Sequence, residues 1–301
     1  MSSGVSTPLF SVIVPTYNRP ESLRLCLESL ARLEYPRDHF EVIVVDDGSP
    51  QRLDAVIEPF GRHLRADLVS QQNAGPAAAR NAGARCAAGR YLAFTDDDCR
   101  PEPDWLAAIL ARLTASPNSL VSGRRRTCAP RSLSAEASQT VADAAYSYYQ
   151  RFPERGQFVS TSNLAVPVDR FHALGGFDAR FRYSEDRDFG ARWREAGFSI
   201  IYAPEAVVCH DMTLTLKALW QRHFEFGRGA FLYHEARRAR TLPQFRPDAR
   251  FYRELFRRPA RESGWPRALL LVALVGVAQA ANTLGYWSER LSIGRSGRRG
   301  Q

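Results

Sequence analysis

Short apolar runs alternate with helical patterns over the first half of the chain. Residues 10–14 (FSVIV), 41–45 (EVIVV) and 91–95 (YLAFT) have the length and the nearly continuous apolar character of buried strands. Between these runs, residues 20–33 carry leucines at helical spacing, and residues 76–88 form an alanine-rich helical stretch. This alternation predicts an α/β fold with a mainly parallel sheet flanked by helices.

The second half departs from this alternation. Residues 124–157 combine an arginine-rich stretch with a tyrosine-rich one, and we expect a helical excursion over one edge of the sheet. Beyond it the pattern predicts a helix over residues 184–196, short strands that end at His210, and a long aromatic helix over residues 214–236. Residues 237–301 differ so sharply in composition that we expect a separate module.

The positive charge of the protein is concentrated in its C-terminal part. The chain has 41 basic and 32 acidic residues, and from His234 onward 14 arginines face five acidic residues, which accounts for the whole excess. A nucleic-acid enzyme more often spreads basic residues around its cleft, whereas a basic tail beside apolar segments suits anionic lipid headgroups. No nucleic-acid partner is therefore expected. A solvated, partly disordered arginine-rich end is the alternative interpretation.

The core size, the cysteines and the N-terminus favour a cytoplasmic protein. With 301 residues, 45% of them hydrophobic, the chain can bury a full-sized core without disulfides or a structural metal. Its five cysteines are odd in number and never spaced as C-x-x-C, which argues against a disulfide framework and a zinc site. The first residues lack the basic start and apolar stretch of a secretory signal.

Polar residues follow three predicted strands at the point where each strand ends. The first strand leads into residues 15–18 (PTYN), the second into residues 46–49 (DDGS), and a later one into residues 96–98 (DDD). In an open parallel sheet, ligands bind outside the carboxyl ends of the strands. We therefore expect these three segments to converge on one rim of the sheet.

The carboxylates of Asp96, Asp97 and Asp98 are the most informative part of this rim. They repel one another and make a poor strand end unless a cation offsets their charge. Hard oxygen ligands favour Mg²⁺ or Mn²⁺, which keep open positions for diphosphate oxygens. A solvated helix-capping turn would explain a lone DDD, but the position at the rim favours a metal site. His210 is either a buried, satisfied histidine or a further metal ligand.

The DDGS segment and Tyr17 each allow two interpretations. One carboxylate of DDGS can accept hydrogen bonds from a base or a ribose while the small residues let a nucleotide approach the backbone. Asp and Gly are, however, also common in plain turns. Tyr17 offers either a flat surface for stacking or a lid over the core.

The SEDRD segment carries a candidate general base at the start of a predicted helix. Ser184 is a plausible N-cap and the acids after it occupy the favoured first turn, which is a complete structural explanation. However, Asp186 shares a helix face with Phe189 and Trp193, which is expected to turn it inward. A carboxylate that points to the interior is costly without a task such as proton abstraction. We interpret Asp188 as a helix-stabilising charge.

Taken together, these motifs resemble those of the family 2 glycosyltransferases, which have the Rossmann-like GT-A fold. The resemblance extends from about Phe10 to Gly229 and rests on six motifs in order: VIVPTYNR, VVDDGS, NAGPAAARNAGARCAAGRYLAFTDDD, SNLAVPVDRFHALGGFD, SEDRDFGARW and VVCH. Each motif alone is unspecific, whereas six in this order are highly specific. Processive relatives carry Q-x-x-R-W after this region; residues 221–224 read QRHF here, which argues against processive synthesis.

The resemblance implies a role for individual residues of these motifs. The donor, a nucleotide diphosphate-sugar, would be bound by Pro15, Tyr17, Asn18, Asp47, Asn73, Gly75, Arg80, Asp96 and Asp97. Asp98 and His210 would hold Mn²⁺ or Mg²⁺, and Asp186 would be the catalytic base. The acceptor side would be formed by Gly176, Phe177, Asp178 and Glu185.

The implied activity is an inverting transfer of a sugar from a UDP-, GDP- or dTDP-linked donor to an acceptor hydroxyl. The acceptor would be a glycan, a glycolipid or a small molecule, in surface polysaccharide or glycolipid synthesis. Residues 1–236 would form the GT-A catalytic domain, with a nucleotide-binding half at about residues 8–125 and an acceptor half at about residues 158–236.

Two other functions are compatible with such a sheet. One is a sugar-nucleotide nucleotidyltransferase, although no glycine-rich, basic phosphate loop follows the first predicted strand. The other is a catalytically silent binding protein on the same fold, against which the acids at positions 98 and 186 speak.

The C-terminal residues 237–301 are expected to associate with a membrane. Residues 268–281 (ALLLVALVGVAQAA) are apolar but shorter than the about 20 residues that a span needs. Aromatic and arginine residues flank them, and an apolar stripe beside arginines at residues 250–258 fits a helix in the headgroup layer. We expect residues 240–301 to attach peripherally or shallowly to anionic lipids at the inner face of the cell membrane. A helix packed on the catalytic domain or on a second subunit is the alternative.

Overall fold

The computed structural model describes most of the chain, namely residues 7–127, 132–151, 159–210, 212–242 and 248–296. The chain forms two compact units: Met1–Cys128 with Val159–Asp211, and Ala129–Phe158 with Met212–Gln301. The unit boundary differs from the one expected at residue 236. The reason is that the helices α5 (Leu133–Arg151) and α8 (Leu216–Ala239) pack with the C-terminal helices.

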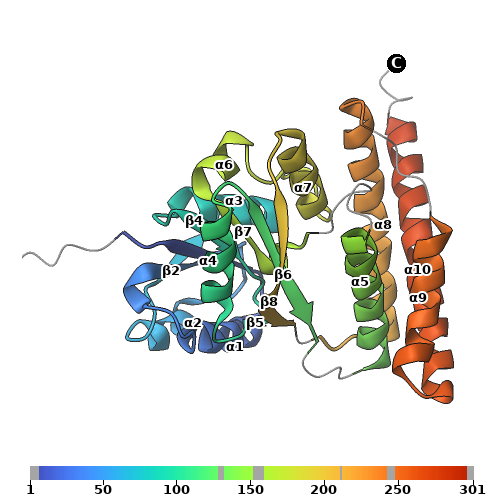
Figure 1. Cartoon of the computed structure of the whole chain (residues 1–301), viewed down its shortest axis with the longest axis horizontal. Helices are drawn as coiled ribbons and strands as arrows, with labels where there is room; N and C mark the ends of the chain where they lie inside the picture. Colours follow the sequence, from blue (N-terminus) through green and yellow to red (C-terminus); the bar gives the residue numbers. More distant parts are fainter. Residues whose placement is uncertain (1–6, 128–131, 152–158, 211, 243–247, 297–301) are drawn as a thin grey trace, which may run out of the picture. The chain divides into compact units, whose positions relative to one another are not determined.

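The first unit is built on one eight-stranded sheet (Figure 1). Its strands lie in the spatial order β3 (Ala66–Ser70), β2 (Phe40–Asp46), β1 (Phe10–Thr16), β4 (Tyr91–Phe94), β7 (Leu164–Pro167), β6 (Leu120–Arg126), β8 (Ile200–His210) and β5 (Cys99–Pro101). The first four are parallel, and β6 pairs with β8 in parallel. The pairs β4–β7, β7–β6 and β8–β5 are antiparallel. The predicted α/β class is confirmed, with a parallel half that contains the predicted rim and a mixed half.

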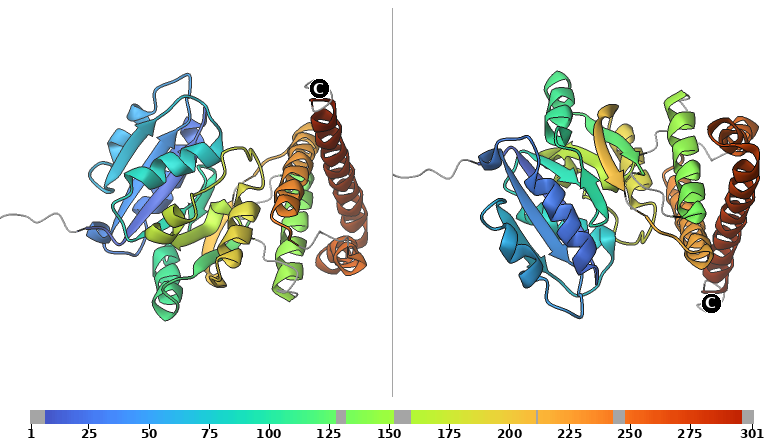
Figure 2. Two further views of the ribbon diagram at one scale, coloured as in Figure 1. Left: turned by 90° about the horizontal axis from the view of Figure 1, so that it is seen from above. Right: turned by 90° about the horizontal axis from the view of Figure 1, so that it is seen from below.

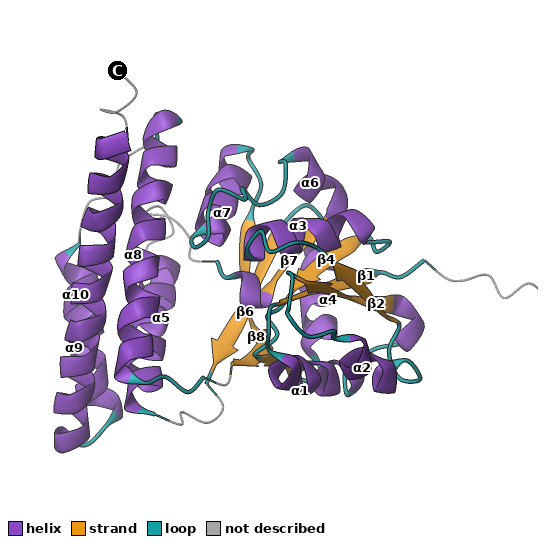
Figure 3. Ribbon diagram, turned by 180° about the vertical axis from the view of Figure 1, so that it is seen from behind, coloured by secondary structure: helices purple, strands orange, loops and turns teal. Residues whose placement is uncertain are grey.

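Helices cover both faces of this sheet (Figure 3). They are α1 (Pro20–Ala31), α2 (Asp54–Ile57), α3 (Pro76–Cys86), α4 (Trp105–Ala115), α6 (Val168–Ala173) and α7 (Glu185–Glu195), with short 3₁₀ turns at Arg37–His39, Glu58–Phe60 and Thr161–Asn163. In β1, Val12 and Val14 pack into the core that contains α1 and α4, and Ile13 packs into the core that contains α3. Strand side chains alternate between faces, so burial of both faces explains the continuous apolar runs.

The mixed half of the sheet was predicted least well. In place of several short strands before His210, the structure has the single strand β8, which is 11 residues long. Strands β5 and β6 have no counterpart among the predicted strands. The second half of β6 is the arginine run at residues 124–126, and its register against β8 shifts between Gly123 and Arg124. A strand with charged residues and a bulge lacks the apolar pattern on which the prediction rests.

A buried asparagine holds this half of the sheet together. Asn163 is fully buried, and its Oδ1 accepts a hydrogen bond from Trp105 Nε1 at 2.9 Å. Its Nδ2 donates to the carbonyl oxygens of Arg124 at 3.0 Å and Ala206 at 2.9 Å. One side chain therefore satisfies backbone groups of β6 and β8 where their ladder is interrupted.

The second unit is helical. It contains α5, α8, α9 (Ala249–Glu262) and α10 (Trp265–Ser296), seen from two sides in Figure 2. Helix α10 lies against α5, α8 and α9. The stretch Trp265–Ile293 is long and apolar enough to cross a membrane by length and composition alone. The apolar helix is thus longer than the run at residues 268–281 suggested.

The cysteines follow the sequence-based expectation only in part. Cys26, Cys86 and Cys99 are free thiols. Cys209, in β8, is disulfide-bonded, so the expectation was wrong at this position. Spacing along the chain does not reveal which cysteines the fold brings together.

Candidate active site

The three predicted rim segments meet at the carboxyl ends of β1, β2 and β4. Strand β1 pairs in parallel with both neighbours, so the three strands end side by side. Thr16 Oγ1 donates to Asp97 Oδ2 at 2.7 Å, and the backbone amide of Asp47 donates to the carbonyl oxygen of Thr16 at 2.9 Å. Thr16, which the sequence analysis did not single out, therefore links all three segments.

The segment after β1 presents an aromatic ring to solvent. Tyr17 is 49% exposed, so it is open for stacking and is not a lid over the core. Pro15 is buried at the end of β1. Asn18 has a φ of 53°, and its backbone amide donates to Ser49 Oγ at 2.8 Å. This bond joins the PTYN segment to the DDGS segment.

The Asp47 carboxylate organises the loop that precedes α3. Its Oδ1 accepts hydrogen bonds from Gln71 Nε2 at 2.7 Å and from the backbone amide of Ala74 at 2.8 Å. Its Oδ2 accepts one from the backbone amide of Gly75 at 2.9 Å. A carboxylate has about four acceptor positions, so little capacity is left for a ligand. DDGS is therefore more than a plain turn, because it shapes a second loop at the rim.

Two glycines allow the loop before α3 to lie close to the DDGS segment. Gly48 has a φ of 84°, and a Cβ there would lie 2.8 Å from the backbone nitrogen of Asn73. Gly75 has a φ of 90° at the start of α3. Both values are favourable only for glycine. The side chain of Asn73 is exposed beside them.

Arginines offset the charge of the acidic trio. Arg80 Nη2 donates to Asp96 Oδ1 at 2.6 Å. Arg19 Nη1 lies 3.2 Å from Asp97 Oδ1 and 3.1 Å from Asp98 Oδ2. Guanidinium groups therefore balance part of the charge of the trio, and the need for a divalent cation stays a prediction.

The trio is also unequal in its surroundings. Asp97 is buried, and burial together with the neighbouring Asp98 raises the pKa of its carboxyl group to about 6, although Arg19 and Thr16 act in the opposite direction. Asp98 is more accessible, with 22% of its side chain exposed. Asp96 (28%) and Asp98 are therefore the acids of the trio that a ligand can reach, and Asp98 is the one that faces His210.

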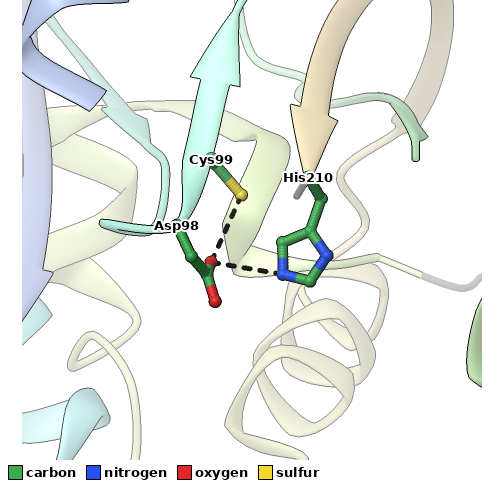
Figure 4. A group of neighbouring side chains, drawn as sticks. All are labelled: Asp98, Cys99 and His210. Carbon is green, nitrogen blue, oxygen red and sulfur yellow. Dashed lines mark hydrogen bonds and ion pairs between the residues drawn. The ribbon is translucent and has the colours of Figure 1, made fainter. Parts of the chain in front are cut away.

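Asp98, Cys99 and His210 form a group of candidate metal ligands (Figure 4). The antiparallel pairing of β5 with β8 places Cys99 opposite His210. His210 Nε2 lies 3.2 Å from Asp98 Oδ1, and Cys99 Sγ lies 3.8 Å from the same oxygen. Burial raises the pKa of the Cys99 thiol well above its usual value, so it stays protonated and is a poor ligand. The remaining candidate ligands are the Asp98 carboxylate and the His210 imidazole.

The buried Nδ1 of His210 has no hydrogen-bond partner among the described residues. A histidine that only filled the core would normally have both ring nitrogens satisfied. Its second nitrogen, Nε2, faces the Asp98 carboxylate instead of a backbone group. This environment favours the metal-ligand interpretation over the buried, satisfied histidine.

Helix α7 begins with two adjacent acids in different environments. Ser184 occupies the N-cap position with a φ of 74°, but its side chain caps no amide, so that part of the prediction was wrong. Glu185 is buried, whereas Asp186 is partly exposed and accepts a hydrogen bond from the backbone amide of Arg187 at 2.8 Å. Burial raises the pKa of both carboxyl groups, that of Glu185 to about 7.

The acid of α7 that turns fully inward is Asp188. It is 1% exposed and accepts a hydrogen bond from Arg192 Nε at 2.8 Å, one helical turn later. Arg192 also donates to the carbonyl oxygens of Leu174 and Gly176. Asp188 thus stabilises the helix as interpreted, but from a buried position. The partial exposure of Asp186 was not expected, and it makes that carboxylate reachable by a substrate.

The predicted acceptor loop is held by a residue that the sequence analysis missed. Asn81 Nδ2 donates to the carbonyl oxygen of Phe177 at 2.7 Å, and the backbone amide of Phe177 donates to Asn81 Oδ1 at 2.9 Å. Phe177 is 1% exposed and its ring packs on Phe94, so it belongs to the core and cannot border an acceptor. Gly176 has a φ of 66°, and Asp178 pairs with Arg180 at 2.6 Å.

Comparison with known sequences decides the family. The sequence profile described as Glycosyl transferase family 2 matches residues 11–175, more than half of the chain. The chain belongs to glycosyltransferase family 2. The matched region contains the whole rim, whereas Asp186 and His210 lie beyond it.

Three curated relatives of this family 2 glycosyltransferase are themselves described as glycosyltransferases. Glycosyltransferase AglE of Haloferax volcanii is 28% identical over 225 residues, which are 74% of this chain and 73% of the relative. Validoxylamine A glucosyltransferase of Streptomyces hygroscopicus subsp. jinggangensis is 31% identical, over 66% of this chain and 54% of its own. Pre-mycofactocin glycosyltransferase of Mycobacterium tuberculosis is 29% identical, over 76% and 48%. The chain thus spans about half the length of the last two.

Solved glycosyltransferase structures share the fold. The mannosyltransferase PcManGT from Pyrobaculum calidifontis, in complex with GDP-Man and Mn²⁺, aligns with a TM-score of 0.65 at 20% identity, over 94% of this chain and 88% of that one. TarS 1–349 of S. aureus, in complex with UDP-GlcNAc, aligns with a TM-score of 0.55 at 17% identity, over 97% and 92%. At these identities the likeness shows the GT-A type fold of the family 2 glycosyltransferase.

Proposed function

We propose that this chain is an inverting, metal-dependent glycosyltransferase that moves a sugar from a nucleotide diphosphate-sugar to an acceptor hydroxyl. The observation that carries the proposal is the 3.2 Å approach of His210 Nε2 to Asp98 at the acidic rim. Arg80 links the same rim to the first turn of α7, where Asp186 lies. A candidate metal-binding group and a candidate base thus belong to segments that Arg80 links.

On the donor side, the rim is proposed to hold the nucleotide. The exposed ring of Tyr17 would stack on the base, and the loop of Asn73 and Gly75 would lie along the diphosphate. Two of the similar solved structures are complexes with GDP-Man and UDP-GlcNAc. GDP- and UDP-sugars are therefore the first donors to test, and dTDP-sugars should be tested as well. This assignment keeps the nucleotide-binding half at about residues 8–125.

The metal is proposed to be held by Asp98 and His210. Mn²⁺ or Mg²⁺ bound there would supply positive charge for the departing diphosphate. The chain's own residues orient that site, because Asp98 directly precedes β5 and the pairing of β5 with β8 places Cys99 opposite His210.

Asp186 is proposed to accept the proton of the acceptor hydroxyl. As the acceptor oxygen bonds to the anomeric carbon, the bond from that carbon to the diphosphate breaks and its electron pair leaves with the diphosphate. A single displacement of this kind inverts the anomeric configuration. Because burial raises the pKa of Asp186, it is a stronger base than an ordinary aspartate.

The acceptor is proposed to be presented at a membrane. Helix α9 carries arginines beside the exposed aromatic residues Tyr252 and Phe256, and α10 exposes apolar side chains along its length. Such surfaces suit the headgroup layer of anionic lipids at the inner face of the cell membrane. A lipid-linked glycan or a surface polysaccharide is the acceptor class that fits this location.

The variant Asp186→Asn tests the proposal. We expect it to lower the release of nucleoside diphosphate from the accepted sugar donor by at least about a hundredfold, because the amide cannot take up a proton. Its affinity for the donor should stay close to wild type in a calorimetric titration. Glu195→Gln, the same chemical change at the exposed end of α7, should leave turnover unchanged.

Substantial turnover by Asp186→Asn would eliminate the base assignment. Release of pyrophosphate by the wild type, in place of a nucleoside diphosphate, would instead identify a nucleotidyltransferase.

A further inference from the structure

Arg80 is a buried arginine whose guanidinium joins two segments of the site. It lies on α3 and is 4% exposed. Its Nη1 donates to Glu185 Oε1 at 2.8 Å, and its Nη2 donates to Asp96 Oδ1 at 2.6 Å. Asp96 follows β4 and Glu185 begins α7, so one side chain spans the donor rim and the helix of the proposed base.

This guanidinium is engaged by carboxylates and is not open to a phosphate group. Its buried Nε has no hydrogen-bond partner among the described residues. Burial alone would lower the pKa of Arg80, but Asp96 and Glu185 raise it, so the group stays charged. Removal of this cation would leave two carboxylates without compensation in a buried place.

We propose that Arg80 is a positioning residue that holds the first turn of α7, and with it Asp186, against the acidic rim, and that it does not bind the donor diphosphate. The inference rests on the proposed role of Asp186 as the base. Glu185 and Asp186 are neighbours, so a clamp on Glu185 fixes the backbone from which Asp186 projects. The residue type matters, because only a planar fork reaches two carboxylates at once.

Charged groups from three segments act on Asp186. Glu185 and Arg187 belong to α7, Arg80 to α3, and Asp96 follows β4. Burial and Asp96 raise the pKa of Asp186, while Arg187 and Arg80 lower it. Loss of the Arg80 charge therefore raises this pKa and protonates the base at higher pH. Glu185 has a pKa of about 7 and is therefore largely protonated in the acidic range in which an aspartate titrates.

The pH dependence of kcat/KM for nucleoside diphosphate release, measured for a pair of variants, tests this inference. Arg80→Gln should move the acidic limb of the profile up by about one pH unit, because it removes a positive charge that lowers the pKa of Asp186. Glu185→Gln removes an acid that is largely protonated over this range, so it should leave the limb near the wild-type position. A limb that moves in one variant and stays in the other cannot arise from a general loosening of the site, because both variants break the contact between Arg80 and Glu185.

Arg80→Lys separates charge from geometry. It should keep the acidic limb near the wild-type position while kcat falls about tenfold, because one ammonium group cannot span both carboxylates. Donor affinity by calorimetry should change little in any of these variants. Arg192→Gln, which removes another arginine paired with an acid of α7, should lower the melting temperature without moving the limb.

A limb that stays in place in Arg80→Gln, or that moves equally in Arg80→Gln and Glu185→Gln, overturns the inference. A loss of donor affinity in Arg80→Gln that equals the loss in kcat/KM overturns it as well, because it would place Arg80 on the diphosphate. If Arg80→Gln does not fold, Glu185→Gln and Arg80→Lys decide. An active Asp186→Asn variant would contradict the proposed function itself. An inactive Asp186→Asn variant, together with an unmoved limb in Arg80→Gln, would contradict only the proposed role of Arg80.

Discussion

Two arginines form ion pairs with the acids of the rim, and they differ in how exposed they are to solvent. Arg80 is buried between Asp96 and Glu185. The Arg19 side chain is 55% exposed where it meets Asp97 and Asp98. Exposed ion pairs contribute little to stability, so Arg19 is the partner that an incoming cation can displace. At the residue scale, the case for a metal ion therefore depends on Asp98 and His210.

At the scale of elements, close helix packing in the second unit depends on two glycines. A Cβ on Gly227 of α8 would overlap the carbonyl oxygen of Asn282, and a Cβ on Gly285 of α10 would overlap that of Phe224. The backbones of α8 and α10 thus approach at two points where no side chain fits. Gly276, also in α10, has nothing within 4 Å of a Cβ position.

The glycine substitutions Gly285→Ala and Gly276→Ala should have opposite effects on stability. Gly285→Ala must separate two helices and should cost about 1–3 kcal/mol of unfolding free energy. Gly276→Ala removes backbone freedom of the unfolded chain in open space and should stabilise by about 0.5–1 kcal/mol. Chemical denaturation followed by circular dichroism measures both. Equal effects would contradict the close crossing of α8 and α10.

The parallel half of the sheet could be predicted because each of its strands is recognised from its own short stretch of sequence. Strands β1, β2 and β4 are buried on both faces, so each appears in the sequence as an apolar run that is followed by polar residues. Strand β6 ends in arginines, and the contacts of Asn163, Asn81 and Thr16 join segments far apart in the chain. The periodicity of apolar residues along the chain does not predict contacts of this kind.

The start of α7 shows a second limit of sequence reasoning. Helical spacing correctly places Phe189 and Trp193 in the core, but Asp186 is in the first turn, where the chain enters from a left-handed residue at Ser184. Which acid is buried there depends on the partner groups Arg80 and Arg192. These partners come from the fold, so the burial of Glu185 and Asp188 could not be predicted.

At the scale of the whole molecule, the chain combines a glycosyltransferase unit with a helical unit that exposes apolar residues. The exposed large apolar side chains of α10 are Trp265, Leu269, Leu270, Leu284, Trp287, Leu291 and Ile293. Other positions of α10, such as Leu271 and Val275, are buried against α5 and α9. A helix with one packed and one exposed apolar side suits attachment along a membrane surface.

Vesicle flotation tests this attachment. The double variant Arg253→Gln/Arg257→Gln, on exposed positions of α9, should weaken binding to vesicles with anionic lipids by about tenfold or more. Its matched control is Arg62→Gln/Arg85→Gln, which removes the same charge from exposed positions of the first unit and should leave binding unchanged. Equal losses in both double variants would show a nonspecific charge effect and contradict an oriented attachment through α9.

The most direct test of the account is a calorimetric titration of UDP-, GDP- and dTDP-sugars with and without Mn²⁺. We expect at least one donor to bind at least about tenfold more tightly with the metal, and Asp98→Asn to abolish this gain. If neither Mn²⁺ nor Mg²⁺ improves the affinity for any of these donors, Asp98 and His210 do not form a metal site for a sugar nucleotide, and the proposed mechanism is wrong.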